Sequence, residues 1–111
     1  MTNSRAVLLE GLSRFTRPSA SGEVPHGRGL FSYCALHRER LVRIVLPQPL
    51  LGVVLSGAKE VWCGESGERY EAGTVFVLPR GIEFDILNLP GERNYQSLIL
   101  RFDRLPAAVA L

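Results

Sequence analysis

The sequence predicts a mainly β protein that closes into one antiparallel sandwich or barrel. Short runs of branched and aromatic residues alternate with turns that contain glycine or proline, which gives seven or eight expected strands. Such a series is typical of all-β domains. The chain has 111 residues, the usual length of a single domain. We therefore expect one small β domain with a short helix at its N-terminus.

The first 29 residues predict an N-terminal helix followed by a loop. Leu8, Leu12 and Phe15 recur at helical spacing within residues 3–15, and Asn3 or Ser4 is suited to cap the helix. This apolar stripe would pack on the main body or on a partner. Residues 16–29 are rich in proline, glycine and serine, the composition of a loop.

The β pattern begins at residue 30 and extends to about residue 105. Residues 30–46 are long enough for two short strands or one bent strand, with a polar turn at residues 37–40. Pro47 and Pro49 then interrupt the pattern, because proline lacks the amide donor of a sheet ladder. Further strands are expected at residues 51–56, 59–63, 69–71, 74–78, 83–87 and 95–102. Residues 106–111 are expected to begin a linker.

The charge of the chain favours neither nucleic acid nor a membrane as a direct partner. The net charge is +2, and the 13 basic residues are scattered along the sequence. The N-terminus has no apolar segment of the kind found in signal peptides, and no apolar run approaches the length of a membrane span. We therefore expect a cytoplasmic location.

One stretch between residues 73 and 88 carries more specific information. Gly73, Pro79, Gly81 and Asn88 are spaced as in the pattern G-x5-P-x-G-x2-H-x3-N, with Phe84 at the histidine position. The glycines permit tight turns and the Pro-x-Gly segment reverses the chain. The stretch resembles the second conserved motif of cupins. The resemblance implies a cupin, or double-stranded β-helix jelly-roll, barrel.

The first cupin motif, G-x5-H-x-H-x3,4-E-x6-G, is only faintly visible. If its last glycine is Gly57, its glutamate position is Leu50. Its two histidine positions fall on Arg43 and Val45, or on Ile44 and Leu46, according to the spacing used. A transition-metal site needs about three converging N, O or S ligands. We therefore expect no metal, no other cofactor and no metal-dependent enzyme activity.

Three further stretches are similar to the N-terminal effector domain of AraC-type transcription regulators. An apolar strand ends in Gly-x-Lys at residues 57–59, and a Tyr-x-x-Gly turn spans residues 70–73. The pattern Tyr-x-x-Leu-x-Leu-x-Phe-Asp closes the domain at residues 95–103. The resemblance covers residues 5–105.

This resemblance implies a sensing and dimerisation domain that binds a small-molecule effector inside the barrel. It implies a homodimer, and contact with DNA only through a second domain with two helix-turn-helix units. The residues after Asp103 are too few to form that domain. The sequence is therefore expected to be a domain taken from a regulator, or a short natural protein that kept only the sensor.

The positions that hold metal in other cupins are expected to line an effector pocket here. Strand alternation adds neighbours on the same faces. The expected lining comprises Arg43, Val45, Leu50, Gly52, Val54, Phe84, Ile86 and Asn88, with Ile44 and Leu46 as the alternative to the first pair. Gly52 indicates space, because a glycine in a strand often allows a close approach. Side chains that fill the barrel completely are the other possibility.

Two rival functions remain open at this point. A filled barrel would make the domain a metal-free interaction or dimerisation module, and the cupin resemblance also leaves a small cupin enzyme. Lys59, Glu60, Arg69 and Glu71 are interpreted as a solvated cross-strand charge set rather than a catalytic one.

Overall fold

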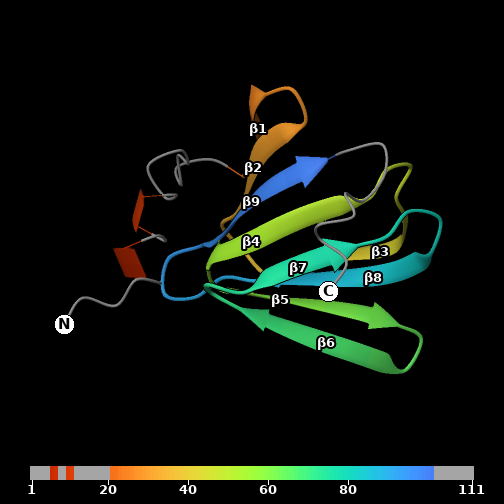
Figure 1. Cartoon of the computed structure of the whole chain (residues 1–111). Helices are drawn as coiled ribbons and strands as arrows, with labels where there is room; N and C mark the ends of the chain where they lie inside the picture. The colour runs from red at the N-terminus through yellow and green to blue at the C-terminus, as the bar shows by residue number, and fades with distance from the viewer. Residues whose placement is uncertain (1–5, 8–9, 12–20, 102–111) are drawn as a thin grey trace.

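The computed structural model describes residues 6–7, 10–11 and 21–101, which form two antiparallel sheets (Figure 1). The five-stranded sheet has the order β1 (Gly22–Gly27), β2 (Leu30–Ala35), β9 (Tyr95–Arg101), β4 (Leu50–Ser56) and β7 (Val75–Leu78). The four-stranded sheet has the order β3 (Glu39–Val45), β8 (Glu83–Leu89), β5 (Ala58–Cys63) and β6 (Ser66–Glu71).

The chain passes repeatedly between the two sheets, as in a jelly roll. It changes sheet between β2 and β3, between β3 and β4, between β4 and β5, and at each step from β6 to β9. The inward faces of both sheets supply one hydrophobic core, with members such as Phe31, Val54, Phe76, Phe84 and Tyr95. This arrangement confirms the predicted all-β jelly-roll class.

Gly57 explains how the chain moves from β4 to β5 within a single residue. Its φ of 75° lies in the left-handed region, and a Cβ there would be 2.4 Å from the carbonyl oxygen of Leu89. Only glycine fits both conditions without strain. The glycine that ends the first motif therefore marks the change of sheet.

The structure differs from the prediction at the loop before residue 30 and describes only part of the predicted N-terminal helix. The predicted loop at residues 16–29 contains a strand, β1, which pairs with β2 from Gly22 to Gly27. Its proline and glycines are typical of a loop, so the sequence pattern did not show a strand. Proline is nevertheless tolerated here, because β1 is at the edge of its sheet. Of the predicted helix, residues 6–7 and 10–11 are helical, and the rest lies outside the described residues, as does the expected linker at 106–111.

A β-bulge in β3 controls which residues face the core. Leu41 is opposite Ile86 and Ile44 is opposite Phe84, so Val42 and Arg43 together oppose only Asp85. Arg43 has a φ of 53°, and its backbone N–H donates to Oδ1 of Asp85 over 2.9 Å. The extra residue shifts the alternation by one position, as bulges do.

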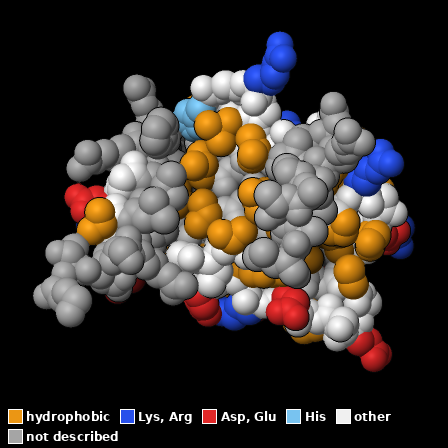
Figure 2. Space-filling model, viewed as in Figure 1, with side chains coloured by type: hydrophobic (Ala, Val, Ile, Leu, Met, Phe, Trp, Pro, Cys, Tyr) orange, Lys and Arg blue, Asp and Glu red, His pale blue; other side chains and the backbone are white. Residues whose placement is uncertain are grey.

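The outer face of the five-stranded sheet carries a second group of apolar side chains. Figure 2 shows hydrophobic side chains gathered around a hollow on the face in view. We call this group the outer apolar patch, and its members are Leu30, Leu51, Val53, Val75, Leu98 and Leu100 around the backbone of Gly52. Val75 is 59% exposed and Leu100 is 37% exposed.

Candidate functional site

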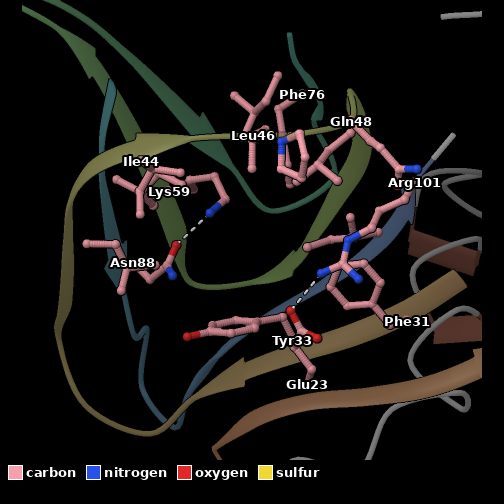
Figure 3. A pocket seen from close by; sticks show the side chains of 16 residues that line it. Glu23, Phe31, Tyr33, Ile44, Leu46, Gln48, Lys59, Phe76, Asn88 and Arg101 are labelled. Atoms are coloured by element: carbon pink, nitrogen blue, oxygen red, sulfur yellow. Dashed lines mark hydrogen bonds and ion pairs between the residues drawn. The ribbon is translucent and has the colours of Figure 1, made fainter. Parts of the chain in front are cut away.

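A cavity of about 300 Å³ lies between the two sheets. Strands of both sheets contribute to it, and Figure 3 shows their side chains converging on it. Its apolar lining consists of Phe31, Leu41, Ile44, Leu46, Pro47, Leu50, Phe76, Leu78, Ile86 and Ile99, and its polar lining of Glu23, Tyr33, Gln48, Lys59, Asn88 and Arg101. A mostly apolar cavity with a few placed polar groups is the usual character of a small-molecule site.

Three polar side chains form a row across the four-stranded sheet. Asn88 on β8 lies directly opposite Glu39 on β3 and Lys59 on β5. The Lys59 ammonium donates to Oδ1 of Asn88 over 2.8 Å, and Nδ2 of Asn88 donates to Oε1 of Glu39 over 2.9 Å. Asn88 therefore connects a cation and an anion that make no direct ion pair with each other.

Tyr33 completes the carboxylate end of this row. Its hydroxyl donates to Oε1 of Glu39 over 2.5 Å. Burial, and secondarily this bond to Glu39, raises the pKa of Tyr33, so the phenol stays protonated and remains a donor. One oxygen of Glu39 thus accepts two hydrogen bonds, which hold the carboxylate on its own side of Asn88.

Lys59 is the buried cation of the site. Its residue exposure is 4%, and its Nζ lies 5.2 Å from the ring centroids of both Phe76 and Tyr95. Burial lowers the pKa of Lys59 to about 8, and the charge of Glu39 partly opposes that shift. The two aromatic faces stabilise the buried ammonium.

A different polar group stands at the other end of the cavity. Nη2 of Arg101 bonds to Oε1 of Glu23 over 2.9 Å, and the Arg101 guanidinium lies 4.1 Å from the ring centroid of Phe31. Figure 3 shows Arg101, Glu23 and Gln48 at one end and Lys59 and Asn88 at the other. Both ends are therefore polar, and apolar side chains separate them.

Three of the predicted lining residues lie at the cavity, and two lie elsewhere because of the bulge. Leu50, Ile86 and Asn88 line it. The prediction that Arg43 and Val45 line the barrel is wrong: both are on the exposed side of β3, and Val45 is 54% exposed. The bulge turns the alternative pair, Ile44 and Leu46, into the cavity instead.

The other three predicted lining residues, Val54, Phe84 and Gly52, do not line the cavity. Val54 and Phe84 are buried, at 0% and 3% exposure, but do not line the cavity. Gly52 was expected to leave space for a ligand, yet a Cβ on it would lie 2.2 Å from Cζ of Phe76. The ring of Phe76, directly opposite on β7, occupies that space.

Lys59 is the functional candidate that sequence reasoning misplaced. Glu60, Arg69 and Glu71 do form an exposed charge set, with ion pairs of 3.1 and 2.6 Å. Lys59 does not join them, because it lies on the opposite face of β5. Strand alternation could have shown this, since Glu60 and Trp62 share one face and Lys59 therefore shares the other with Val61.

The described residues contain neither a metal-binding cluster nor a membrane-spanning helix. Within residues 6–7, 10–11 and 21–101, no three His, Cys, Asp or Glu side chains gather in a way that could hold a metal ion. No helix in those ranges is long and apolar enough to cross a membrane.

Comparison with known proteins places the fold. No protein-family model and no curated protein sequence matches the chain. Among solved structures, it is similar to a Ralstonia eutropha protein named as a candidate mannose-6-phosphate isomerase (TM-score 0.62, 15% identity, 78% of this chain and 90% of that one). It is similar to a double-stranded β-helix protein from Klebsiella pneumoniae (TM-score 0.59, 16% identity, 83% and 86%).

A third similar structure is an RmlC-like cupin from Methanocaldococcus jannaschii (TM-score 0.59, 9% identity, 79% of this chain and 87% of that one). At these identities the likeness establishes the fold alone. The protein is a cupin-fold domain of the double-stranded β-helix type, with a cavity between its sheets.

Proposed function

We propose that this cupin domain is the sensing domain of an AraC-type bacterial transcription regulator and binds a small-molecule effector between its sheets. The observation that carries the proposal is a buried ammonium group, Lys59, that lines a cavity of about 300 Å³ with mostly apolar walls. Burying a charge is costly unless it is compensated. A bound ligand that interacts with the ammonium would provide this compensation.

The regulatory part of the proposal rests on the sequence resemblance described above. In it, the domain works in the cytoplasm as a homodimer, and DNA is contacted only through a helix-turn-helix domain outside residues 1–111. The effector would shift the balance between two arrangements of the attached domain. Such a shift can be no larger than the difference in the effector's affinity for the two states.

We propose binding rather than catalysis, because the polar row makes fixed contacts instead of presenting a reactive pair. The Asn88 amide uses both its oxygen and its nitrogen in the row, and Glu39 Oε1 accepts two bonds. The name of the Ralstonia eutropha neighbour keeps a small cupin enzyme as the rival, and steady-state assays with sugar phosphates would test that rival.

Ligand binding is tested by thermal denaturation of the 111-residue chain with a panel of metabolites. A ligand that binds only the folded state raises the midpoint. Ile44→Trp would fill the cavity, and we expect it to abolish the rise. Val42→Trp is the matched control, because Val42 is 52% exposed on the same strand. A panel with no stabilising compound would contradict the proposal.

Regulation is tested by fusing the chain to a heterologous DNA-binding domain that requires dimerisation. Reporter expression should then respond to the same compounds that raise the denaturation midpoint. A response that survives Ile44→Trp would show that the cavity is not the sensing site.

A second candidate function is supported by the outer apolar patch. Contiguous exposed apolar surface on a small domain often marks an interaction site. The patch would make the domain a metal-free dimerisation module, with or without an effector. Light scattering should then give the mass of a dimer, which Leu98→Lys should reduce to that of a monomer while Val42→Lys leaves it unchanged.

A further inference from the structure

Lys59 is the single lysine of this sequence, and the fold buries it. The other 12 basic residues are arginines. A lysine ammonium has three N–H donors. Among the described residues, the Lys59 ammonium finds one hydrogen-bond acceptor, Oδ1 of Asn88. Two donors of a nearly inaccessible cation are therefore left without an acceptor in the described protein.

The neighbouring carboxylate does not fill this gap. Oε1 of Glu39 already accepts from Tyr33 and from Asn88. Asn88 stands between the carboxylate and the ammonium, because its strand, β8, lies between β3, which carries Glu39, and β5, which carries Lys59. The remaining contacts of Nζ are with the faces of Phe76 and Tyr95, which attract a cation but accept no ordinary hydrogen bond.

From this geometry we infer that the effector is a monocarboxylate with an apolar body, and that its two carboxylate oxygens accept the two spare hydrogen bonds of Lys59. The inference rests on the proposed function, since it names the class of effector. A carboxylate supplies one negative charge and two acceptor oxygens for one positive charge and two donors. Hydrogen bonds between charged partners are about twice as strong as neutral ones.

The walls of the cavity decide against more polar anions. Ten of its sixteen lining residues are apolar, among them Ile44, Leu46, Phe31 and Phe76. A sugar acid would leave hydroxyl groups against these walls without partners, which is costly. A phosphate monoester would bring a second charge that Lys59 cannot neutralise.

The volume of the cavity limits the size of the apolar body. About 300 Å³ corresponds to roughly ten water-sized groups. Phenylacetate and hexanoate fall in this range. Arg101 and Glu23 place hydrogen-bonding groups at the far end, where a small polar substituent on the end of the body away from the carboxylate would find partners.

The test compares each acid with its own amide by titration calorimetry on the 111-residue chain. We expect phenylacetate and hexanoate to bind about tenfold or more tightly than phenylacetamide and hexanamide, the factor that a charged hydrogen bond supplies. Lys59→Met should remove this preference. Arg69→Gln, which removes a positive charge from the outside of the barrel, should leave it unchanged.

A second measurement keeps the test independent of how the variant folds. Growth on ¹³C,¹⁵N-lysine labels a single side chain of the natural protein, Lys59, and leaves its three N–H donors unchanged. In a separate experiment, the carboxylates should slow the reductive methylation of Lys59 by formaldehyde. In the labelled protein, NMR titration should show that phenylacetate raises the pKa of Lys59 and that phenylacetamide does not.

The outcomes separate this inference from the proposed function. Equal affinity for acid and amide, or an acid preference that survives Lys59→Met, overturns the carboxylate assignment. If neutral compounds bind and Ile44→Trp abolishes their binding, the cavity is still an effector site and only the inferred class is wrong. If no compound of either kind binds, both the inference and the proposed function fail.

Discussion

Lys59 and Asn88 lie directly opposite each other on β5 and β8, and the Lys59 ammonium donates a 2.8 Å hydrogen bond to Oδ1 of Asn88. Both residues are almost fully buried, at 4% and 1% exposure. The pair sets a charged group inside a barrel whose other walls are largely apolar. We expect the stability of the domain and the titration of Lys59 to depend on this pair.

The stability of the protein should depend on pH through Lys59. Folding lowers the pKa of this lysine from 10.5 to about 8. Between these values the unfolded chain binds more protons than the folded chain, so the free energy of unfolding rises with pH. Below pH 8 the cost of burying the ammonium is fully present, and above 10.5 it is absent.

Urea denaturation of the natural protein and of Lys59→Met measures this cost. Their difference in unfolding free energy should change by about 2 kcal/mol between pH 7.5 and 9.5, in favour of the natural protein at the higher pH. Because the two proteins share all other titrating groups, the difference between their unfolding free energies isolates the pH dependence that Lys59 causes. Curves that run parallel across this range would show that Lys59 is not charged and buried as the structure indicates.

The carboxylate of Glu39 should support the positive charge of Lys59. Its charge acts against the lowering of the Lys59 pKa by burial. We expect Glu39→Gln to lower the pKa of Lys59 further below 8, as measured by NMR of the ¹³C-labelled lysine. Glu71→Gln is the control, because Glu71 bonds to Arg69 outside the barrel and should leave the titration unchanged. A pKa that rises in Glu39→Gln would contradict the electrostatic assignment.

The close approach of Phe76 to Gly52 should make any larger residue at this position destabilising. A methyl group at position 52 would overlap the ring of Phe76, which is 1% exposed and has little freedom to move. We expect Gly52→Ala to lower the free energy of unfolding by about 1–3 kcal/mol, as overpacking of a core does. Thermal and urea denaturation measure the loss.

Gly27→Ala provides the comparison for that measurement. Gly27 has nothing within 4 Å of the position that a Cβ would occupy. Its replacement should therefore cost much less than that of Gly52. Similar losses at both positions would mean that the glycine conformation, and not the contact with Phe76, determines the result.

The bulge at Arg43 should respond to the backbone preference of the residue placed there. Arg43 has a φ of 53°, which costs an ordinary residue about 1–2 kcal/mol. We expect Arg43→Gly to raise the free energy of unfolding by about 0.5–1 kcal/mol, after the greater flexibility of glycine in the unfolded chain is subtracted. Arg43→Val should lower it, because a branched residue tolerates this conformation poorly. The reverse order would refute the bulge geometry.

The fold was predictable because its strongest signals are local. Gly73, Pro79 and Gly81 encode turns through their own backbone preferences. The alternation of residues 95–101 likewise separates an inward face from an outward one without reference to any other strand. Such properties depend on near neighbours, which the sequence displays directly.

The candidate site was predictable only in part, and the errors have physical causes. Leu50, Ile86 and Asn88 follow regular alternation and do line the cavity. Arg43 and Val45 do not, because one extra residue in β3 reverses the face of everything after it. A bulge is a property of two paired strands and is not visible in either one alone.

Composition and local pattern by themselves determined the class of the domain, its turns and most of its strands. The tertiary structure alone decided the contents of the barrel. It placed Phe76 over Gly52, and it aligned Glu39, Asn88 and Lys59, which are far apart in the sequence, in one row of a sheet. The physical reason is that strand register brings distant residues together, and register is a property of two paired strands that neither strand shows alone.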